Sequence, residues 1–259
     1  MQDPGPAVWR ERLALVGALS QKNFQVRYKA TSLGVLWAVA QPLFQAVVLA
    51  VIFTQVFRLG DSVPHYPVYV ISGILPWAFF TQSLLAATTA VTDNSSLVRK
   101  VSVPLVVFPA AAIGGVGIAF SASLLVLLGA TVVAGTWSWH LLLLPVAVLL
   151  HLLVVAAVGL LTAAFHVAFR DIRYVIESLL LVGLYATPIL YPVSRVPAEA
   201  RPYLDLNPMT GVLSLYRNAV LQQPIGLRAV LVSAVGGTLL LVLSWTVFRR
   251  RSGEFPDLV

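Results

Sequence analysis

The stretch VRYKATSLGVLWAVAQP, residues 26–42, joins two cations and a tyrosine to an apolar run that continues well beyond it. Cations beside an apolar segment of about 20 residues mark the aqueous edge of a transmembrane helix. The whole chain agrees with this, because 59% of its 259 residues are hydrophobic and 10% are charged. A soluble domain carries roughly 25% charged residues. The sequence therefore predicts an integral membrane protein.

Several classes of protein do not fit this composition. The chain has no cysteine, so disulfides, thiolate metal sites and cysteine nucleophiles are excluded. The start, MQDPGPAVWRERL, lacks the apolar core and small-residue cleavage site of a removable signal peptide. A net charge of +7 is compatible with nucleic-acid binding, but the cations stand at the ends of apolar runs rather than among clustered aromatics. No nucleic-acid partner is expected.

Apolar segments long enough to cross a membrane recur along the chain, separated by charged or Pro/Gly-rich breaks. No charged residue occurs between 103 and 169, where only GTWSWH, residues 135–140, divides two of the segments. The six predicted spans are residues 33–57, 67–91, 103–133, 141–169, 174–193 and 229–248.

The cations predict the orientation of these spans. With both termini in the cytoplasm, 12 of the 17 cations lie inside, in agreement with the positive-inside rule. The predicted inside cations are Arg10, Arg12, Lys22, Arg27, Lys29, Arg99, Lys100, Arg170, Arg173 and Arg249 to Arg251.

The segment before the first span favours an amphipathic helix. In residues 9–26, Trp9, Leu13, Val16 and Phe24 share one helical face. Such a helix lies in the membrane interface with its cations near the lipid headgroups.

Four short motifs carry a family resemblance. The pattern RYKxxSLGxLW at 27–37, followed by QP at 41–42, resembles the start of ABC-2 type permeases that export lipid-linked polysaccharides, O-antigens and teichoic acids. NSSLVRKVSVP (94–104), FRDIRYVIES (169–178) and TPILYP (187–192) with LNPMTGVLSLYRNAVL (206–221) are similar to later segments of that family, in the same order.

The resemblance implies a domain plan for an all-α integral membrane protein with six transmembrane helices. Residues 1–32 form the cytoplasmic N-terminus with the amphipathic interface helix, and 33–248 form the transmembrane domain. Within it, 92–102 is a cytoplasmic coupling loop, and 194–226 is an external segment with re-entrant gate helices between spans five and six. Residues 249–259 form a cytoplasmic basic tail.

The cytoplasmic motifs contain candidate contacts with a partner ATPase, each with a simpler alternative. Arg27 and Lys29 either only orient the first span or contact the ATPase or lipid phosphates. Residues 94–100 form either a short coupling helix, with Asn94 or Ser95 as N-cap, or an ordinary loop. Arg170 and Asp171 form either an ion pair at the membrane edge or a brace near the ATPase. The candidate coupling residues are Arg27, Lys29, Asn94, Ser95, Leu97, Val98, Arg99, Lys100, Arg170 and Asp171.

Aromatic residues are candidates for the transport path, because sugar rings stack on aromatic planes and their hydroxyls bind tyrosine hydroxyls. Most aromatics in a membrane protein face lipid or the interfacial belt, so only a subset lines a conduit. The candidate channel and gate residues are Tyr66, Tyr69, Trp77, Phe80, Tyr185, Tyr191, Tyr216 and Arg217.

The chain contains no GxxxxGK[ST] motif, so it has no phosphate-binding loop of its own. A secondary transporter would be expected to carry ionisable groups deep in its spans, and those are scarce here. The resemblance implies a homodimeric, non-enzymatic permease that works with two copies of an ABC ATPase, which binds ATP and Mg²⁺.

The expected cargo is a polyprenyl-diphosphate-linked polysaccharide of O-antigen or cell-wall galactan type, exported across the bacterial inner membrane. The alternatives are a permease for teichoic acid, a drug or another lipid, and a membrane-embedded enzyme. The enzyme alternative has only Asp171, Glu177 and His166 as candidate site residues.

Overall fold

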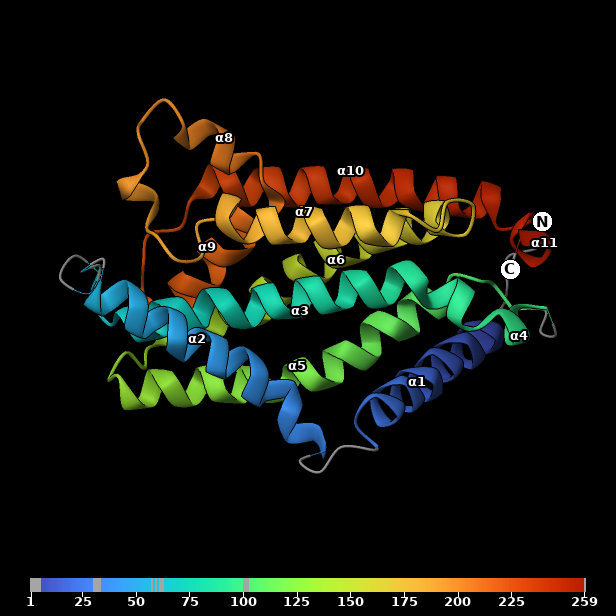
Figure 1. The fold of residues 1–259 in the computed structure, drawn as a ribbon, viewed down its shortest axis with the longest axis horizontal. Helices are drawn as coiled ribbons and strands as arrows, with labels where there is room; N and C mark the ends of the chain where they lie inside the picture. Colours follow the sequence, from blue (N-terminus) through green and yellow to red (C-terminus); the bar gives the residue numbers. More distant parts are fainter. Residues whose placement is uncertain are drawn as a thin grey trace.

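The computed structural model describes residues 6–29, 34–56, 58, 60, 63–99 and 103–258. All regular elements in these ranges are helices (Figure 1). The prediction of an all-α protein is confirmed.

Five segments of the described chain are helical, long and apolar enough to cross a membrane. They are α2 (Trp37–Gln55), α3 (Tyr66–Asp93), α5 (Val107–Val133), the segment Trp139–His166 and α10 (Leu227–Arg251). Segment Trp139–His166 consists of a 3-10 turn, Trp139–Leu143, and α6, Leu144–His166. The chain is thus a multi-pass membrane protein.

The remaining predicted span, 174–193, holds a shorter helix. Helix α7 covers Ile172–Ala186, 15 residues, which is about 22 Å long at 1.5 Å per residue and shorter than a hydrocarbon core of about 30 Å. Its end follows from the sequence, since Thr187 precedes Pro188 and adopts an extended conformation that a helix cannot continue. The count of six spans stays a prediction.

The expected N-terminal helix forms as α1, Pro6–Tyr28, and packs along α5. Two glycines of α5 make this approach possible, because a Cβ on Gly114 would collide with Ser20 Oγ and one on Gly115 would lie 3.0 Å from the Ser20 carbonyl oxygen. Leu13 is exposed on α1. The position of α1 in the membrane interface stays a prediction.

Helix α3 forms the centre of the bundle and contacts α2, α5, α6, α7 and α9. Its Phe79 stacks on Phe120 of α5 at 4.4 Å between ring centroids, and His151 of α6 meets Phe79 edge-on at 4.9 Å. Buried hydroxyls also join the helices, since Thr88 and Thr162 lie 2.8 Å apart between α3 and α6. A hydrogen bond within a low-dielectric interior is favourable because no water competes for the two groups.

The two ends of the bundle carry different short elements (Figure 1). The short helices α4 (Ser95–Val98) and α11 (Phe255–Leu258) contact each other at one end, called here the inner end. Helices α8 (Arg201–Asp205) and α9 (Pro208–Leu221) lie toward the other, the outer end. Most of α9 is buried, and Asn207 caps its N-terminus by accepting a hydrogen bond from the Met209 amide at 3.0 Å.

Candidate functional site

At the outer end, two tyrosines of α3 hold the turn that follows α7. The Tyr66 hydroxyl donates to the Leu190 carbonyl at 2.7 Å, and the Tyr69 hydroxyl donates to the Tyr191 carbonyl at 2.8 Å. The two rings stack, with their centroids 5.9 Å apart. Two carbonyls of this irregular turn are thereby satisfied inside the protein, as a membrane segment requires.

Arg217 of α9 binds the same turn. Its Nη1 donates to the Pro188 carbonyl at 2.6 Å and its Nη2 to the Ile189 carbonyl at 2.8 Å. The guanidinium also lies 3.6 Å from the centre of the Tyr69 ring, in cation–π geometry. Tyr66, Tyr69 and Arg217 therefore form one unit, the outer cluster, that joins α3, α9 and the 188–191 turn.

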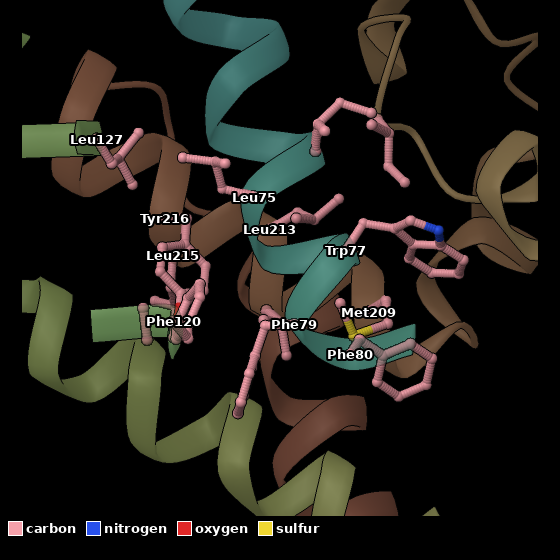
Figure 2. Packing of buried hydrophobic residues seen from close by; sticks show 14 of the residues in the cluster. Leu75, Trp77, Phe79, Phe80, Phe120, Leu127, Met209, Leu213, Leu215 and Tyr216 are labelled. Atoms are coloured by element: carbon pink, nitrogen blue, oxygen red, sulfur yellow. The ribbon is translucent and has the colours of Figure 1, made fainter. Parts of the chain in front are cut away.

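The other predicted aromatics divide between the interior and the surface of this chain. Tyr216 has no exposed surface and meets Phe120 and His151 edge-on in the core. Trp77 and Phe80 of α3 are also buried, with their ring centroids 5.4 Å apart (Figure 2). Tyr185 is 63% exposed on α7, and its carbonyl accepts a hydrogen bond from the Tyr191 hydroxyl. The structure therefore joins Tyr66, Tyr69, Tyr185, Tyr191 and Arg217 and leaves Tyr216 in the core.

A polar groove of about 320 Å³ lies between α2, α3 and α7. Its polar lining is Gln41, Gln45, Thr81, Gln82 and Glu177, and Trp77 contributes an aromatic wall. These glutamines are not among the site residues predicted from sequence. Gln41 and Gln45 stand at i and i+4, so one face of an otherwise apolar span is polar, and this spacing is the signal that identifies them.

A second cavity lies between α1, α3 and α5 and extends to Asn94, the residue before α4. Arg27 and Asn94 both line this cavity of about 450 Å³, and Arg27 Nη1 donates to Gln82 Oε1 at 3.3 Å. The predicted N-cap hydrogen bond from the Asn94 side chain to α4 is not formed. The Asn94 side-chain amide donates instead to the Ala90 carbonyl at 2.8 Å, at the C-terminal end of α3. Lys29 is exposed at the end of α1, and Lys100 lies outside the described residues.

The predicted coupling helix forms as α4, with one buried and one exposed side. Ser95 and Leu97 are partly exposed and Arg99 is exposed, whereas Val98 is buried. Val98 belongs to an inner apolar cluster, defined here as Val98, Leu105, Phe108, Phe248 and Phe255. Val98 thus anchors α4 to the bundle, and the role of α4 in docking a second protein stays a prediction.

Phe255 is the residue of this cluster that the sequence analysis missed. It is 1% exposed and meets Phe248 edge-on at 5.2 Å, so the tail after α10 folds back beneath α4. The available signal was an aromatic residue directly after the charged RRRSGE run. The tail was predicted only as a basic segment, and the structure adds this apolar anchor.

Arg170 and Asp171 lie at the same inner end without pairing to each other in the part of the chain that the structure describes. Arg170 Nη2 donates instead to the Leu258 carbonyl of α11 at 3.4 Å. The nearby ion pair is Arg173–Glu177, 2.9 Å long and exposed, which contributes little to stability. Among the described residues, no three His, Asp or Glu side chains come together in a metal-binding arrangement.

The amino-acid sequence is similar to a family of membrane transporters and to several of its members. The sequence profile of the family described as ABC-2 type transporter matches residues 14–221. The chain is 30% identical to the O-antigen export system permease protein RfbA of Myxococcus xanthus, over 94% of both chains. It is 24% identical to the protein of the same name from Klebsiella pneumoniae over 95% of both chains. It is also 24% identical to the polysialic acid transport protein KpsM of Escherichia coli, over 80% of this chain and 81% of that protein.

Proposed function

Because the chain belongs to the ABC-2 type transporter family, we propose that it is the permease subunit of an ATP-driven polysaccharide exporter. It is a transport subunit rather than an enzyme, and hydrolysis is performed by a separate ATPase. The relatives named for O-antigen export and polysialic acid transport support a polysaccharide cargo. The cargo is a polyprenyl-diphosphate-linked surface glycan of O-antigen or galactan type.

The observation that carries this proposal is the polar groove between α2, α3 and α7. Gln41, Gln45 and Gln82 offer amide donors and acceptors within membrane-spanning helices, where such groups are costly when they face lipid. Amides and a neighbouring indole plane match the hydroxyls and the C–H faces of sugar rings. The groove is therefore one wall of the path for the glycan.

A second copy of the chain completes this path. The outer faces of α2 and α7 on either side of the groove expose large apolar side chains. Among them, Phe44 is 74% exposed on α2, and Leu181 is 66% exposed on α7. A homodimer that packs these two faces together encloses both grooves and removes their amides from lipid.

The inner end is the docking face for two copies of an ABC ATPase, which bind ATP and Mg²⁺. Helix α4 and Arg99 contribute to this face, and Arg170 donates to the Leu258 carbonyl of α11, which contacts α4. Both termini are then cytoplasmic, and the protein lies in the bacterial inner membrane. Helix α7 with the 187–193 turn completes the sixth crossing, and α9 is a re-entrant helix of the outer gate.

The test is ATP hydrolysis by the permease reconstituted in lipid with the ATPase encoded nearest to it. We expect polyprenyl-linked glycan to stimulate hydrolysis above a lipid-only control. A complex without a glycan response would contradict the cargo and favour teichoic acid, a drug or another lipid. Failure to bind the ATPase would contradict the assignment of the inner end.

A further inference from the structure

A cavity of about 490 Å³ opens at the outer end between α9, the turn after α7 and the start of α10. Much of its wall is apolar, with Val63, Pro188, Pro192 and Ala229 among the lining residues. Its volume lies within the range of about 300–1,000 Å³ typical of small-molecule sites. It is separate from the groove between α2, α3 and α7, because the two share no lining residue.

One face of α9 supplies the polar part of the wall. Thr210, Ser214 and Arg217 all line the cavity, and their spacing of four and three residues places them on the same side of the helix. Ser214 Oγ already accepts a hydrogen bond from the Gly226 amide at 2.7 Å. Thr210 and Arg217 are each 5% exposed, so both are buried polar groups.

Both of these side chains hold a hydrogen-bond donor that is not used. Arg217 Nε and Thr210 Oγ1 are buried without a hydrogen-bond partner among the residues that the structure describes. Arg217 binds two carbonyls through Nη1 and Nη2 and lies over the Tyr69 ring. No carboxylate of the described chain forms an ion pair with it. A buried charge without a counter-ion is costly, so the charge of Arg217 is only partly compensated.

We propose that this cavity binds an oxyanion, a phosphate or carboxylate group, through Arg217 Nε and the Thr210 hydroxyl. An oxyanion accepts from both unused donors and supplies the missing negative charge. Asp205 also lines the cavity, but its carboxylate lies 3.7 Å from Arg228 Nε and is thereby partly compensated. The oxyanion therefore binds at the Arg217 end. The remaining apolar volume accommodates the molecule that carries it.

This inference does not depend on the cargo of the exporter, because three sources share the chemistry. Free phosphate, a phospholipid headgroup and an acidic sugar each present an oxyanion. The three probes are inorganic phosphate, glycerol 1-phosphate as the headgroup fragment, and glucuronate as the acidic sugar. Glucose serves as the neutral control, and chloride at matched ionic strength controls for screening.

The key variant is Thr210→Val in the full-length protein. Because Thr210 Oγ1 has no partner in the described chain, replacing it with a methyl group of similar shape should leave the stability of the ligand-free protein unchanged. A matched control is Thr238→Val on α10, whose hydroxyl is exposed and bonds only to the Ala234 carbonyl. Arg217→Lys is the second variant, since it removes Nε while it keeps the charge.

The measurement is the thermal unfolding midpoint, followed by tryptophan fluorescence, as each probe is titrated. We expect at least one oxyanion probe to raise the midpoint of the wild type and of Thr238→Val, and the probe that acts identifies the source. The apparent dissociation constant should rise about tenfold in Thr210→Val, as expected for a lost hydrogen bond to a charged group. Three results would overturn the proposal: no response to any oxyanion, an equal response in Thr210→Val, or an equal response to glucose or chloride.

Discussion

Tyr216 is packed in the core of the bundle, with its ring edge-on to His151 at 5.9 Å between centroids and its hydroxyl 3.4 Å from His151 Nδ1. We expect Tyr216→Ala to lower the stability of the folded protein by about 3–5 kcal/mol, because it leaves a cavity where the ring was. Tyr216→Phe keeps the ring and should have a small effect. Thermal unfolding in detergent measures both, and equal midpoints for the two variants would exclude a packing role.

Arg217, its neighbour in sequence, has a different role because it points to the other side of α9. Its guanidinium donates to two successive carbonyls in a turn where prolines at 188 and 192 offer no amide hydrogen of their own. Tyr216 thus belongs to the apolar core and Arg217 to the polar outer cluster, although they are adjacent in α9. The direction in which each side chain points determines which of the two groups it joins.

Helices α9 and α10 approach each other closely at Gly211. A Cβ at this position would collide with the Ala229 carbonyl and with Ser233 Oγ. We expect Gly211→Ala to displace α9 and destabilise the protein by about 1–3 kcal/mol, the usual cost of overpacking. The control is Gly236→Ala in α10, where an added Cβ meets no atom within 4 Å. Because alanine has a higher helix propensity than glycine, this variant should be no less stable than the wild type.

Both glycine variants can be compared by thermal unfolding and by protease cleavage near α9. Cleavage that rises in Gly211→Ala alone would support the close approach of the two helices. Equal resistance of both variants to the protease would show that α10 moves aside without destabilising the protein.

The tail helix α11 supports α4 from below through Phe255, in the inner apolar cluster. We expect Phe255→Ala to lower permease-dependent ATP hydrolysis several-fold, because Val98 then loses a packing partner and α4 is no longer held firmly. Glu254→Ala changes an exposed neighbour and should leave hydrolysis intact.

The readout for Phe255 combines co-purification with the ATPase and hydrolysis by the complex. Retained association with reduced hydrolysis would place Phe255 in coupling. Normal hydrolysis in Phe255→Ala would remove the tail from that role.

The molecule as a whole exposes the apolar faces of α2 and α7, which the proposed dimer covers. Because the natural chain has no cysteine, a single introduced cysteine is an unambiguous probe. We expect Leu181→Cys on α7 to form dimers with a short bis-maleimide crosslinker in membranes. Val235→Cys, 58% exposed on α10, faces lipid in this arrangement and should remain monomeric. Dimers of the α10 variant alone would place the interface on the other side of the bundle.

Membrane-spanning segments follow from sequence alone, because a run of about 20 apolar residues has few stable alternatives to a helix in lipid. Residues 67–91 and 103–133 were predicted in this way and correspond to α3 and α5. The span predicted at 174–193 ran past the actual end of α7 at Ala186, although the restriction on a residue that precedes proline indicates a helix end before Pro188. The motifs at 27–42 and 206–221 also identified the family before any contact was known.

The tertiary structure decided which side chains act together. Phe255 reaches α4, and Arg217 reaches the carbonyls of residues 188 and 189. Nor did the sequence indicate that Tyr216 is buried while Thr210 and Arg217 line a cavity. In a chain that is apolar on nearly every face, hydropathy gives the length of a helix but not its rotation. That rotation is determined by close packing at positions such as Gly115 and Gly211, where the distance between two backbones is settled only when both helices are in place.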